Sequence, residues 1–595
     1  MSVPLWNNRV SHTDAGTGAS GDCCVTLNDV LGCDTTKPEE LWDHVLLGSY
    51  LLDITWLLRA VECLRQVGTS FVVVSGEKDS GTHLLKKQQD GTDKWVAQSE
   101  ALKRVNPIVH AAKLQLKECS TFSVVEPRLP YPYGTHHSKF ALCVNKNGLR
   151  VAIFTSNLVE SDWRLKHQGI YCQDFPLKVG TQPRDSPRGH AFSSYLCQYL
   201  RQYGFCNATA NYMDHAPLSF FGSAFLDRYD FTDAKVYLVA SIPGVHDGIR
   251  SCPGDDDHAY FGLHRIAQVV KHCVPSMERA APPILSWQYT SQGTLTDSFL
   301  EKVCAAMSGT RCATDHGKVS FPQVQVVYPT EDEVKQSIEG WRSGFSIPVR
   351  MRCWHTFLNT RLCRWGHRST ARSAPCRALV AHEGGESDET VASFLRPKGM
   401  PHMKTYAAVH PDRSGLFWLL LTSANLSQAA WGSPQGGGGR STASPARLLI
   451  RSYELGVLYD YTSSIELSSV FSITPSAASK MAAALSVVDP ELYEASLVST
   501  HHESSVVRSA SVRLPYDILH PTPYRSTSVL QMGGVLDAAS REDVPWILDM
   551  PHSGTDALGV SFVDAVSAAD SISPKDVLAH WSAVGRDTKL KRKRA

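Results

Sequence analysis

Short, uninterrupted apolar runs recur along the chain, and most of them are too short for a helix. Runs of this kind are typical of strands that are covered on both faces of a sheet. The clearest examples are residues 71–75, 151–154, 236–241, 324–329 and 417–421. The segment from Val45 to Val61 has apolar residues at helical spacing, and helix-compatible sequence follows Thr330. Strands that alternate with helical segments predict an α/β fold.

A set of four polar and aromatic residues occurs twice, each time around one of these apolar runs. Each copy has a His, a Lys two residues later, an Asn at the end of the run and a Trp six residues after the Asn. The copies consist of His137, Lys139, Asn157 and Trp163, and of His402, Lys404, Asn425 and Trp431. Because the His and Lys are two residues apart, their side chains point to the same face of a strand. The ordered repetition predicts two related halves that share one site.

These residue types suit a substitution at phosphorus. One imidazole can attack while the other protonates the departing oxygen, since histidine titrates near neutral pH. The lysines and asparagines can supply positive charge and amide donors to oxygens that gain charge in the transition state. The reaction would therefore need no metal ion and no cofactor. In the alternative interpretation each half has a buried, hydrogen-bonded His and a solvated Lys, but buried polar groups do not require the same order twice.

At these residues the sequence resembles the phospholipase D superfamily, whose signature is a repeated His-x-Lys with a downstream Asn. Most members have an Asp five residues after the Lys, whereas this chain has Val144 and Val409 there. This difference, together with several local motifs, makes the chain similar to the tyrosyl-DNA phosphodiesterases. The motifs are residues 134–139, 155–158, 423–427, 430–432 and 452–456, and weaker similarity runs from about Tyr50 to Pro551. The resemblance implies two similar α-β-α sandwich domains, related by a pseudo-twofold axis, with the active site at their interface.

The resemblance also implies a function in DNA repair, the hydrolysis of the bond between a DNA 3′ phosphate and a tyrosine left by a stalled topoisomerase I. In this interpretation His137 attacks phosphorus and forms a covalent phosphohistidine. His402 protonates the leaving tyrosine and then activates a water. Glu454 would hydrogen-bond the second nitrogen of His137, and Gln168 would orient His402. The phosphoryl oxygens would be held by Lys139, Lys404, Asn157 and Asn425.

Two other functions are weighed against this one. A general nuclease or phospholipase of the same superfamily is disfavoured by the missing Asp in both halves. A catalytically silent DNA-end-binding protein is disfavoured because all six His, Lys and Asn residues are present.

The expected partner is a single-stranded or duplex DNA 3′ end that carries a covalently attached topoisomerase peptide. Tyr133, four residues before His137, is expected to stack on a base near the scissile bond. Residues 290–294 resemble the phosphate-contacting loop of the family, which assigns DNA contacts to Thr290, Ser291 and Thr294.

A basic segment lies between Gly340 and His382. It has eight Arg and no Asp or Glu, and aromatic residues are interleaved with the Arg. Arg next to aromatic side chains suits phosphate contacts and base stacking, which assigns DNA contacts to Arg364, Arg368 and Arg372. In the alternative interpretation the aromatic side chains belong to the core and the Arg form a solvated face.

Composition narrows the class of protein. The net charge of the 595 residues is +1, so local basic patches must hold any nucleic acid. Sixteen cysteines without a Cys-x-x-Cys spacing indicate reduced intracellular thiols. The irregular spacing of Cys353, His355, Cys363 and His367 favours ordinary buried thiols over a zinc site. No apolar stretch reaches the ~20 residues that a bilayer requires, which disfavours a membrane-embedded enzyme.

Four parts of the chain are expected. They are a loosely ordered lead-in (1–35), a first phospholipase-D-like domain (36–245), a second such domain (246–584) and a basic tail (585–595). The tail favours a nuclear import signal over an inert terminus, and hence a nuclear protein. Residues 251–258 are interpreted as a solvated acidic turn, and residues 433–441 as a flexible loop that either borders the cleft or is an inert insertion. A monomer suffices, because one chain carries both copies of the set.

Overall fold

The structure is a computed structural model in which both predicted halves contain a large sheet. It describes residues 5–7, 26–33, 35–65, 69–76, 84–87, 93–96, 116, 121–125, 127–179, 186–203, 218–221, 225–247, 260–273, 282–310, 312–315, 318–366, 398–413, 415–435, 447–460, 493–496, 511–514, 516–525 and 543–567.

The first sheet has eight strands. Seven of them follow the order β1-β9-β8-β7-β2-β3-β6, and β17 also pairs with β9. The strands are β1 (Leu5–Asn7), β2 (His44–Ser49), β3 (Ser70–Ser75), β6 (Thr121–Val125), β7 (Phe140–Asn145), β8 (Gly148–Phe154), β9 (Lys166–Pro176) and β17 (Met400–Pro401). Strands β2, β3 and β6 are parallel, and β2, β7, β8 and β9 are antiparallel from one neighbour to the next.

The second sheet repeats this topology in the order β10-β22-β19-β18-β12-β15-β16. Its strands are β10 (Tyr237–Ser241), β12 (Ile284–Gln288), β15 (Val324–Val327), β16 (Leu362–Cys363), β18 (Thr405–Val409), β19 (Leu416–Thr422) and β22 (Glu454–Asp460). Strands β12, β15 and β16 are parallel, and β12, β18, β19 and β22 alternate in direction. Strand order and direction match those of the first sheet, which confirms the prediction of two similar α/β units.

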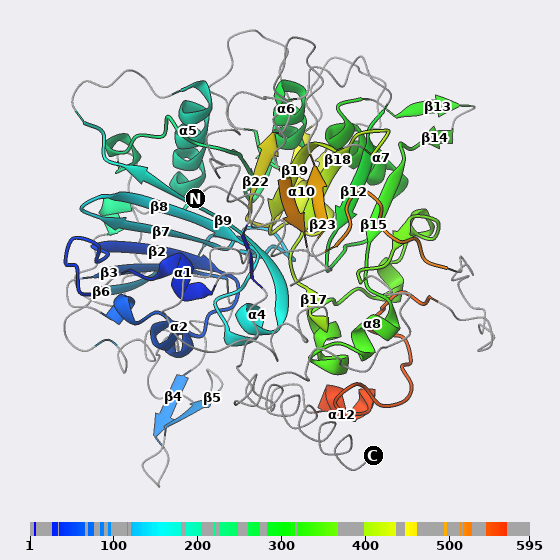
Figure 1. The fold of residues 1–595 in the computed structure, drawn as a ribbon, viewed down its shortest axis with the longest axis horizontal. Coiled ribbons are helices and arrows are strands. Elements are labelled where there is room, and N and C mark those ends of the chain that lie inside the picture. The colour runs from blue at the N-terminus through cyan, green and yellow to red at the C-terminus, as the bar shows by residue number, and fades with distance from the viewer. Residues whose placement is uncertain are drawn as a thin grey trace, which may run out of the picture.

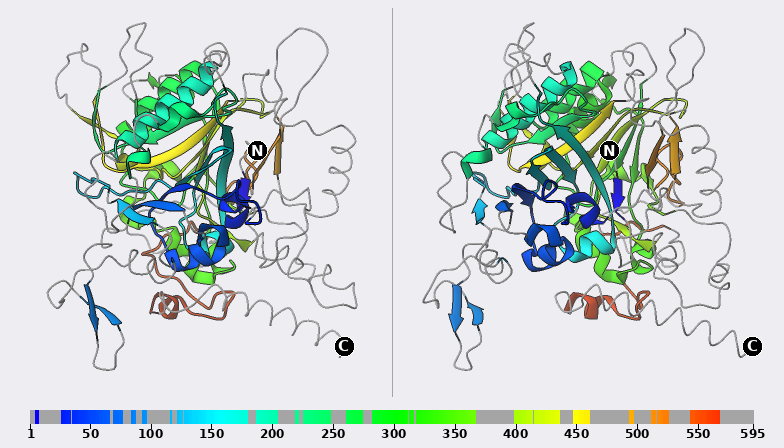
Figure 2. Two further views of the ribbon diagram at one scale, coloured as in Figure 1. Left: turned by 90° about the vertical axis from the view of Figure 1, so that its left-hand side faces the viewer. Right: turned by 60° about the vertical axis from the view of Figure 1, so that its left-hand side comes forward.

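Helices cover both faces of the first sheet, because its strands bury side chains on both sides. Val45 and Leu47 share a core with Leu57 of α2, whereas the intervening Leu46 belongs to the core that contains Tyr199 of α5. Helices α1, α2 and α4 lie on one side of the first sheet and α5 lies on the other, whereas α6 and α7 pack on the second sheet (Figures 1 and 2). These helices are α1 (Leu27–Leu31), α2 (Ile54–Ala60), α4 (Glu160–Arg164), α5 (Pro187–Arg201), α6 (Leu263–Cys273) and α7 (Asp297–Ser308).

Smaller elements complete the described structure. The helices are α8 (Glu331–Lys335), α10 (Gln428–Trp431) and α12 (Phe562–Ser567), with 3-10 turns at Glu62–Arg65, Leu218–Phe221, Phe225–Arg228, Gly340–Ser346, Met351–Cys353 and Thr356–Leu358. The strands are β4 (Leu84–Lys87), β5 (Asp93–Val96), β11 (Gly244–His246), β13 (Ala313–Asp315), β14 (Lys318–Ser320), β20 (Ser433–Gln435), β21 (Arg447–Ile450), β23 (Tyr493–Ser496) and β24 (Ser511–Leu514).

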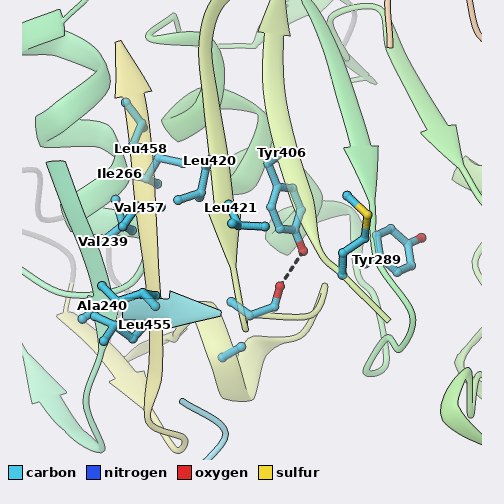
Figure 3. Close-up of a cluster of buried hydrophobic side chains, with 14 of the residues drawn as sticks. Val239, Ala240, Ile266, Tyr289, Tyr406, Leu420, Leu421, Leu455, Val457 and Leu458 are labelled. Atoms are coloured by element: carbon cyan, nitrogen blue, oxygen red, sulfur yellow. Dashed lines mark hydrogen bonds between the residues drawn. The ribbon is translucent and has the colours of Figure 1, made fainter. Parts of the chain in front are cut away.

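Apolar side chains form a cluster in the core of the second half. Figure 3 shows Leu420 and Leu458 near Ile266 of α6, and Leu455 beside Ala240 of β10. The Tyr406 hydroxyl in the same cluster donates to the carbonyl of Ala424 at 3.1 Å. Ala424 directly precedes Asn425, so this hydrogen bond connects the core to the end of β19, where the repeated Asn lies.

Two predictions about the elements need correction. The segment from Val45 to Val61 is not one helix, because its first part is the central strand β2 and only Ile54–Ala60 is helical. An apolar run that is buried on both faces satisfies either pattern, and strand pairing with β3 and β7 decides the outcome. The predicted limits also shift, since β10 precedes residue 245 but pairs with β22 of the second sheet. The predicted lead-in contains β1 and α1.

Candidate active site

The two copies of the repeated set lie at equivalent places in the two sheets. His137 and Lys139 directly precede β7, and His402 and Lys404 directly precede β18. Asn157 follows β8, and Asn425 follows β19. Since β7 corresponds to β18 and β8 to β19 in the matched strand orders, both sets lie at the same end of their sheets.

Each histidine is held by a residue from the opposite half. The Nδ1 atom of His137 lies 3.0 Å from Oε2 of Glu454, the first residue of β22. The Nδ1 atom of His402 lies 3.1 Å from Nε2 of Gln168, near the start of β9. The backbone repeats this exchange, because His137 N donates to the carbonyl of Tyr453 and His402 N donates to the carbonyl of His167, both at 2.9 Å. Such mutual exchange is the contact pattern that a twofold axis produces.

A hydroxyl group fixes each of these partners. The Thr155 hydroxyl donates to Oε1 of Gln168 at 2.7 Å and accepts from the backbone N of Gly169 at 3.0 Å. In the second half the Ser423 hydroxyl donates to Oε2 of Glu454 at 2.5 Å and accepts from the backbone N of Leu455 at 3.1 Å. The Glu454 carboxylate can only accept, so Ser423 must donate. The equivalent bond from Thr155 to Oε1 leaves the NH₂ group of Gln168 directed at His402.

The lysines and asparagines are also held in matching ways. Lys139 and Lys404 are fully buried, and each donates through Nζ to the carbonyl of its own histidine, at 2.7 Å and 2.5 Å. Asn157 Oδ1 accepts from the backbone N of Leu51 at 3.3 Å, and Asn425 Oδ1 accepts from that of Ser291 at 2.9 Å. Asn425 can then offer its NH₂ group to a ligand, and Asn157 can offer the NH₂ hydrogen that it does not donate to Asp162. The structure thus brings all eight predicted catalytic residues together in one interface.

This geometry agrees with the comparison to known proteins. A family model described as tyrosyl-DNA phosphodiesterase matches residues 4–525. The chain belongs to the tyrosyl-DNA phosphodiesterase family. It is therefore a phosphodiesterase, a hydrolase that acts in DNA repair.

Individual relatives of this phosphodiesterase are distant in sequence. It is 28% identical over 554 residues to tyrosyl-DNA phosphodiesterase 1 of Arabidopsis thaliana, and the match covers 93% of this chain and 75% of the relative. It is 29% identical over 348 residues to a probable tyrosyl-DNA phosphodiesterase of Caenorhabditis elegans, with 56% of this chain and 64% of the relative covered. A crystal structure of the yeast tyrosyl-DNA phosphodiesterase is similar at 15% identity and a TM-score of 0.46, over 78% of this chain and 91% of that one.

Burial governs the protonation of the phosphodiesterase's cationic groups. It lowers the pKa of the Lys139 ammonium to about 8, against the opposing pull of Glu454 and Asp162. Burial also lowers the pKa of Lys404 well below its ordinary value, and the charge of Lys139 acts in the same direction. A bound anion would reverse these shifts, since an opposite charge nearby favours the charged form.

The histidines follow the same rule. Burial lowers the pKa of His137, although Glu454 opposes the change. Burial lowers the pKa of His402 to about 3, with Lys404 acting in the same direction and Asp162 against it. Both imidazoles of the free protein are therefore neutral at neutral pH, and protonation of His402 requires an added negative charge.

Asp162 belongs to the site but was missed in the sequence. Its Oδ2 lies 3.2 Å from Nδ1 of His402 and accepts from the backbone N and from Nδ2 of Asn157, at 2.8 Å and 2.9 Å. Its Oδ1 lies 3.0 Å from Nζ of Lys166. Burial would raise the pKa of the Asp162 carboxyl, but His402 and Lys166 hold it well below its ordinary value. The sequence signal is the acidic residue just before Trp163, where the second copy has Ala430 before Trp431.

The predicted DNA-contacting residues differ in exposure. The Tyr133 side chain is 86% exposed, and its backbone has a φ of 61°, which is rare for a residue other than glycine. Thr294 is exposed and Ser291 is half-buried. Thr290 is buried, and its backbone N and hydroxyl point to Oδ1 of Asn425 at 3.2 Å and 3.4 Å. Thr290 therefore positions Asn425, and the DNA contact predicted for it stays a prediction.

Arg364 is likewise buried, in an ion pair with Asp543. Its buried guanidinium donates from Nε to Oδ2 of Asp543 at 3.0 Å, and its Nη2 pairs with the other oxygen of that carboxylate. The neighbouring aromatic side chains Trp341, Phe357 and Trp365 belong to the core. These aromatic side chains have the core role of the alternative interpretation, but Arg364 is buried and does not lie on a solvated face. Arg368 and Arg372 lie outside the described residues.

Several other predictions concern residues outside the described part of the chain, namely the acidic turn, most of the Gly-rich loop, the basic tail and His367. Cys353 is half-buried in a 3-10 turn, and Cys363 is buried in β16. Among the described residues, no group of three or more His, Cys, Asp or Glu could hold a metal ion. No helix of the described chain is long and apolar enough to cross a membrane.

Proposed function

We propose that this phosphodiesterase hydrolyses the bond between a DNA 3′ phosphate and a tyrosine left by topoisomerase I. Nε2 of His137 attacks phosphorus, a P–N bond forms, and the bond to the tyrosine oxygen breaks. His402 donates its Nε2 proton to that oxygen. In the second step a water attacks the phosphohistidine, His402 accepts the proton of the water, and the P–N bond breaks. The products are a DNA 3′ phosphate and free tyrosine.

One observation carries the assignment of roles, the hydrogen bond between His137 and Glu454. A carboxylate can only accept, so in neutral His137 the hydrogen lies on Nδ1 and the lone pair lies on Nε2. A lone pair on Nε2 is what a nucleophile requires. Gln168 instead presents its NH₂ group to His402, which leaves a hydrogen on Nε2 of that ring.

The charge of the transition state would be held by the two lysines and the two asparagine NH₂ groups. All four lie at strand ends of the same interface. Each lysine is fixed by one hydrogen bond from Nζ to a backbone carbonyl, and each asparagine by a backbone N–H that donates to its Oδ1. Donors held in place in this way stabilise developing charge without reorganisation. The chemistry therefore proceeds through protein groups and needs no metal ion.

The DNA strand is proposed to pass Tyr133 and the loop that contains Ser291 and Thr294. The exposed ring of Tyr133 is four residues from His137 and can stack on a base. The Tyr50 ring lies edge-on to the His137 ring, with 5.8 Å between the centroids, and forms another wall of the site. Support for a nuclear location comes from the basic tail, and support for a monomer from the presence of both histidine sets in one chain.

The test is a single-stranded oligonucleotide with a 3′-phosphotyrosine, incubated with the protein in EDTA. We expect release of tyrosine and a 3′-phosphate oligonucleotide, and no product with His137→Ala. Internal cleavage of an unmodified oligonucleotide would favour a general nuclease, and binding without turnover would favour a silent DNA-end binder. Loss of turnover in EDTA that added magnesium or zinc restores would contradict the role given to the lysines and asparagines.

A further inference from the structure

The two halves differ at one charged position of the site. Asp162 and Ala430 both follow the repeated Asn by five residues and precede the repeated Trp. Only the first half therefore places a carboxylate there, and this carboxylate lies next to the histidine of the second half, 3.2 Å from its Nδ1. The partner across the interface also differs, since His137 has the carboxylate of Glu454 and His402 has the amide of Gln168.

A donor and an acceptor thus face the same nitrogen of His402. Gln168 offers its NH₂ group, because Thr155 occupies its oxygen. A donor at Nδ1 suits only the neutral ring that carries its hydrogen on Nε2. Asp162 offers a carboxylate oxygen, which suits any form of the ring that carries a hydrogen on Nδ1.

The proposed reaction uses only forms of His402 with a hydrogen on Nδ1. The general acid is the imidazolium, which has hydrogens on both nitrogens. Loss of the Nε2 proton to tyrosine leaves the neutral ring with its hydrogen on Nδ1 and a free lone pair on Nε2, and this is the form that accepts a proton from water. The Gln168 amide, as Thr155 orients it, cannot accept the Nδ1 hydrogen in either form.

We propose that Asp162 is the positioning residue that accepts the Nδ1 hydrogen of His402 throughout catalysis, while Gln168 holds the neutral ring of the free enzyme. Asp162 can fill this role because it is fixed and ionised. Asn157 donates two hydrogen bonds to the oxygen that faces His402, and Lys166 pairs with the other oxygen. Glu339 of the second half lies 4.0 Å from the same Lys166 ammonium and extends the network across the interface. This inference rests on the proposed function.

The experiment compares two leaving groups. Oligonucleotides with a 3′-phosphotyrosine and with a 3′-(4-nitrophenyl) phosphate are cleaved by wild type, Asp162→Asn and Asp162→Glu. General acid catalysis contributes roughly 10²- to 10⁴-fold, and a more acidic phenol needs less of it. We expect Asp162→Asn to lower kcat/KM for the tyrosyl ester about tenfold or more beyond its effect on the nitrophenyl ester, and Asp162→Glu to restore part of the difference. An equal loss with both esters, or no loss, would overturn the proposal.

The pH profile supplies a second measurement. The charged groups that act on His402 are Lys404, Asp162 and Lys166. Loss of the Asp162 charge should move the alkaline decline of kcat, which reports the enzyme–substrate complex, to lower pH, because the imidazolium loses its acceptor. Lys166→Gln should move the alkaline decline to higher pH. This variant provides the test if Asp162→Asn does not fold. An alkaline decline that moves to lower pH in Lys166→Gln, or does not move, would count against the proposal.

A matched control comes from β9, the strand that follows the helix of Asp162. Asp174→Asn also removes one carboxylate, but Asp174 lies towards the far end of β9, is exposed and pairs with Arg150 on the surface. It should leave the ratio of the two esters unchanged. If wild type cleaves neither ester, the proposed function fails. If wild type cleaves both and Asp162→Asn does not discriminate, only the role of Asp162 fails.

Discussion

Substrate affinity should fall at alkaline pH because Lys139 binds the phosphodiester in its charged form. Burial places the pKa of this lysine at about 8 in the free protein, compared with about 10.4 for an ordinary lysine. Below pH 8 the ammonium is present and binding has its full strength. Above pH 8 the free protein must take up a proton to bind, so affinity falls tenfold for each pH unit. At pH 9 this term alone weakens binding about tenfold, or about 1.4 kcal/mol.

The assay is fluorescence anisotropy of a 3′-phosphotyrosyl oligonucleotide with His137→Ala, which keeps the substrate intact. His137→Ala retains the carbonyl that Lys139 bonds, and it retains Glu454 and Asp162, the carboxylates that act on that lysine. The matched variant adds Lys139→Met, which has no charge to lose. We expect it to bind more weakly at pH 7 and to show a shallower decline towards pH 9. Equal declines in the two proteins would refute the idea that Lys139 carries the effect.

Three further predictions follow from the structure. Replacement of His402 by Asn should slow the second step and accumulate a covalent DNA adduct on His137, whereas His137→Ala should form no adduct. Mass spectrometry that finds the adduct on His402 of the wild-type protein would reverse the roles of nucleophile and general acid. Arg364→Met should lower the free energy of unfolding by about 3–5 kcal/mol, because it leaves Asp543 buried without its partner. The salt dependence of DNA binding should not change, and a flatter salt dependence in a stable variant would support a DNA contact for Arg364. Tyr133→Gly should weaken oligonucleotide binding by about 1–3 kcal/mol through lost stacking. It should also raise the thermal stability, since glycine relieves the backbone strain at a φ of 61°. Tyr133→Phe is the control, and unchanged affinity in Tyr133→Gly would contradict the stacking role.

The sequence allowed the repeated site to be predicted because its members keep fixed spacings next to apolar strands. His137 and Lys139, for example, are two residues apart and lie on the backbone that leads into β7. Asp162 has no counterpart in the second copy, and its role arises from contact with a residue 240 positions later in the chain. Local patterns do not report which side chains meet across an interface.

The basic segment shows a related limit at Arg364. The composition of a segment gives the number of charged residues but not their ion-pair partners. The partner of Arg364 is Asp543, which lies far along the chain. The apolar run at Val45 shows the same limit for the fold. Its pattern satisfies both helix and strand, and only pairing with β3 and β7, from other parts of the sequence, selects the strand.

The exchange of Glu454 and Gln168 between the halves has a consequence for how such a site could arise. A single-half ancestor would form a symmetric dimer in which each subunit's strand served the histidine of the other subunit. In such a dimer every substitution appears twice, so both histidines must share one environment and cannot specialise. Fusion of the two copies into one chain removes that constraint. Glu454 could then remain an acid while position 168 became an amide, and Asp162 could appear opposite a plain Ala430.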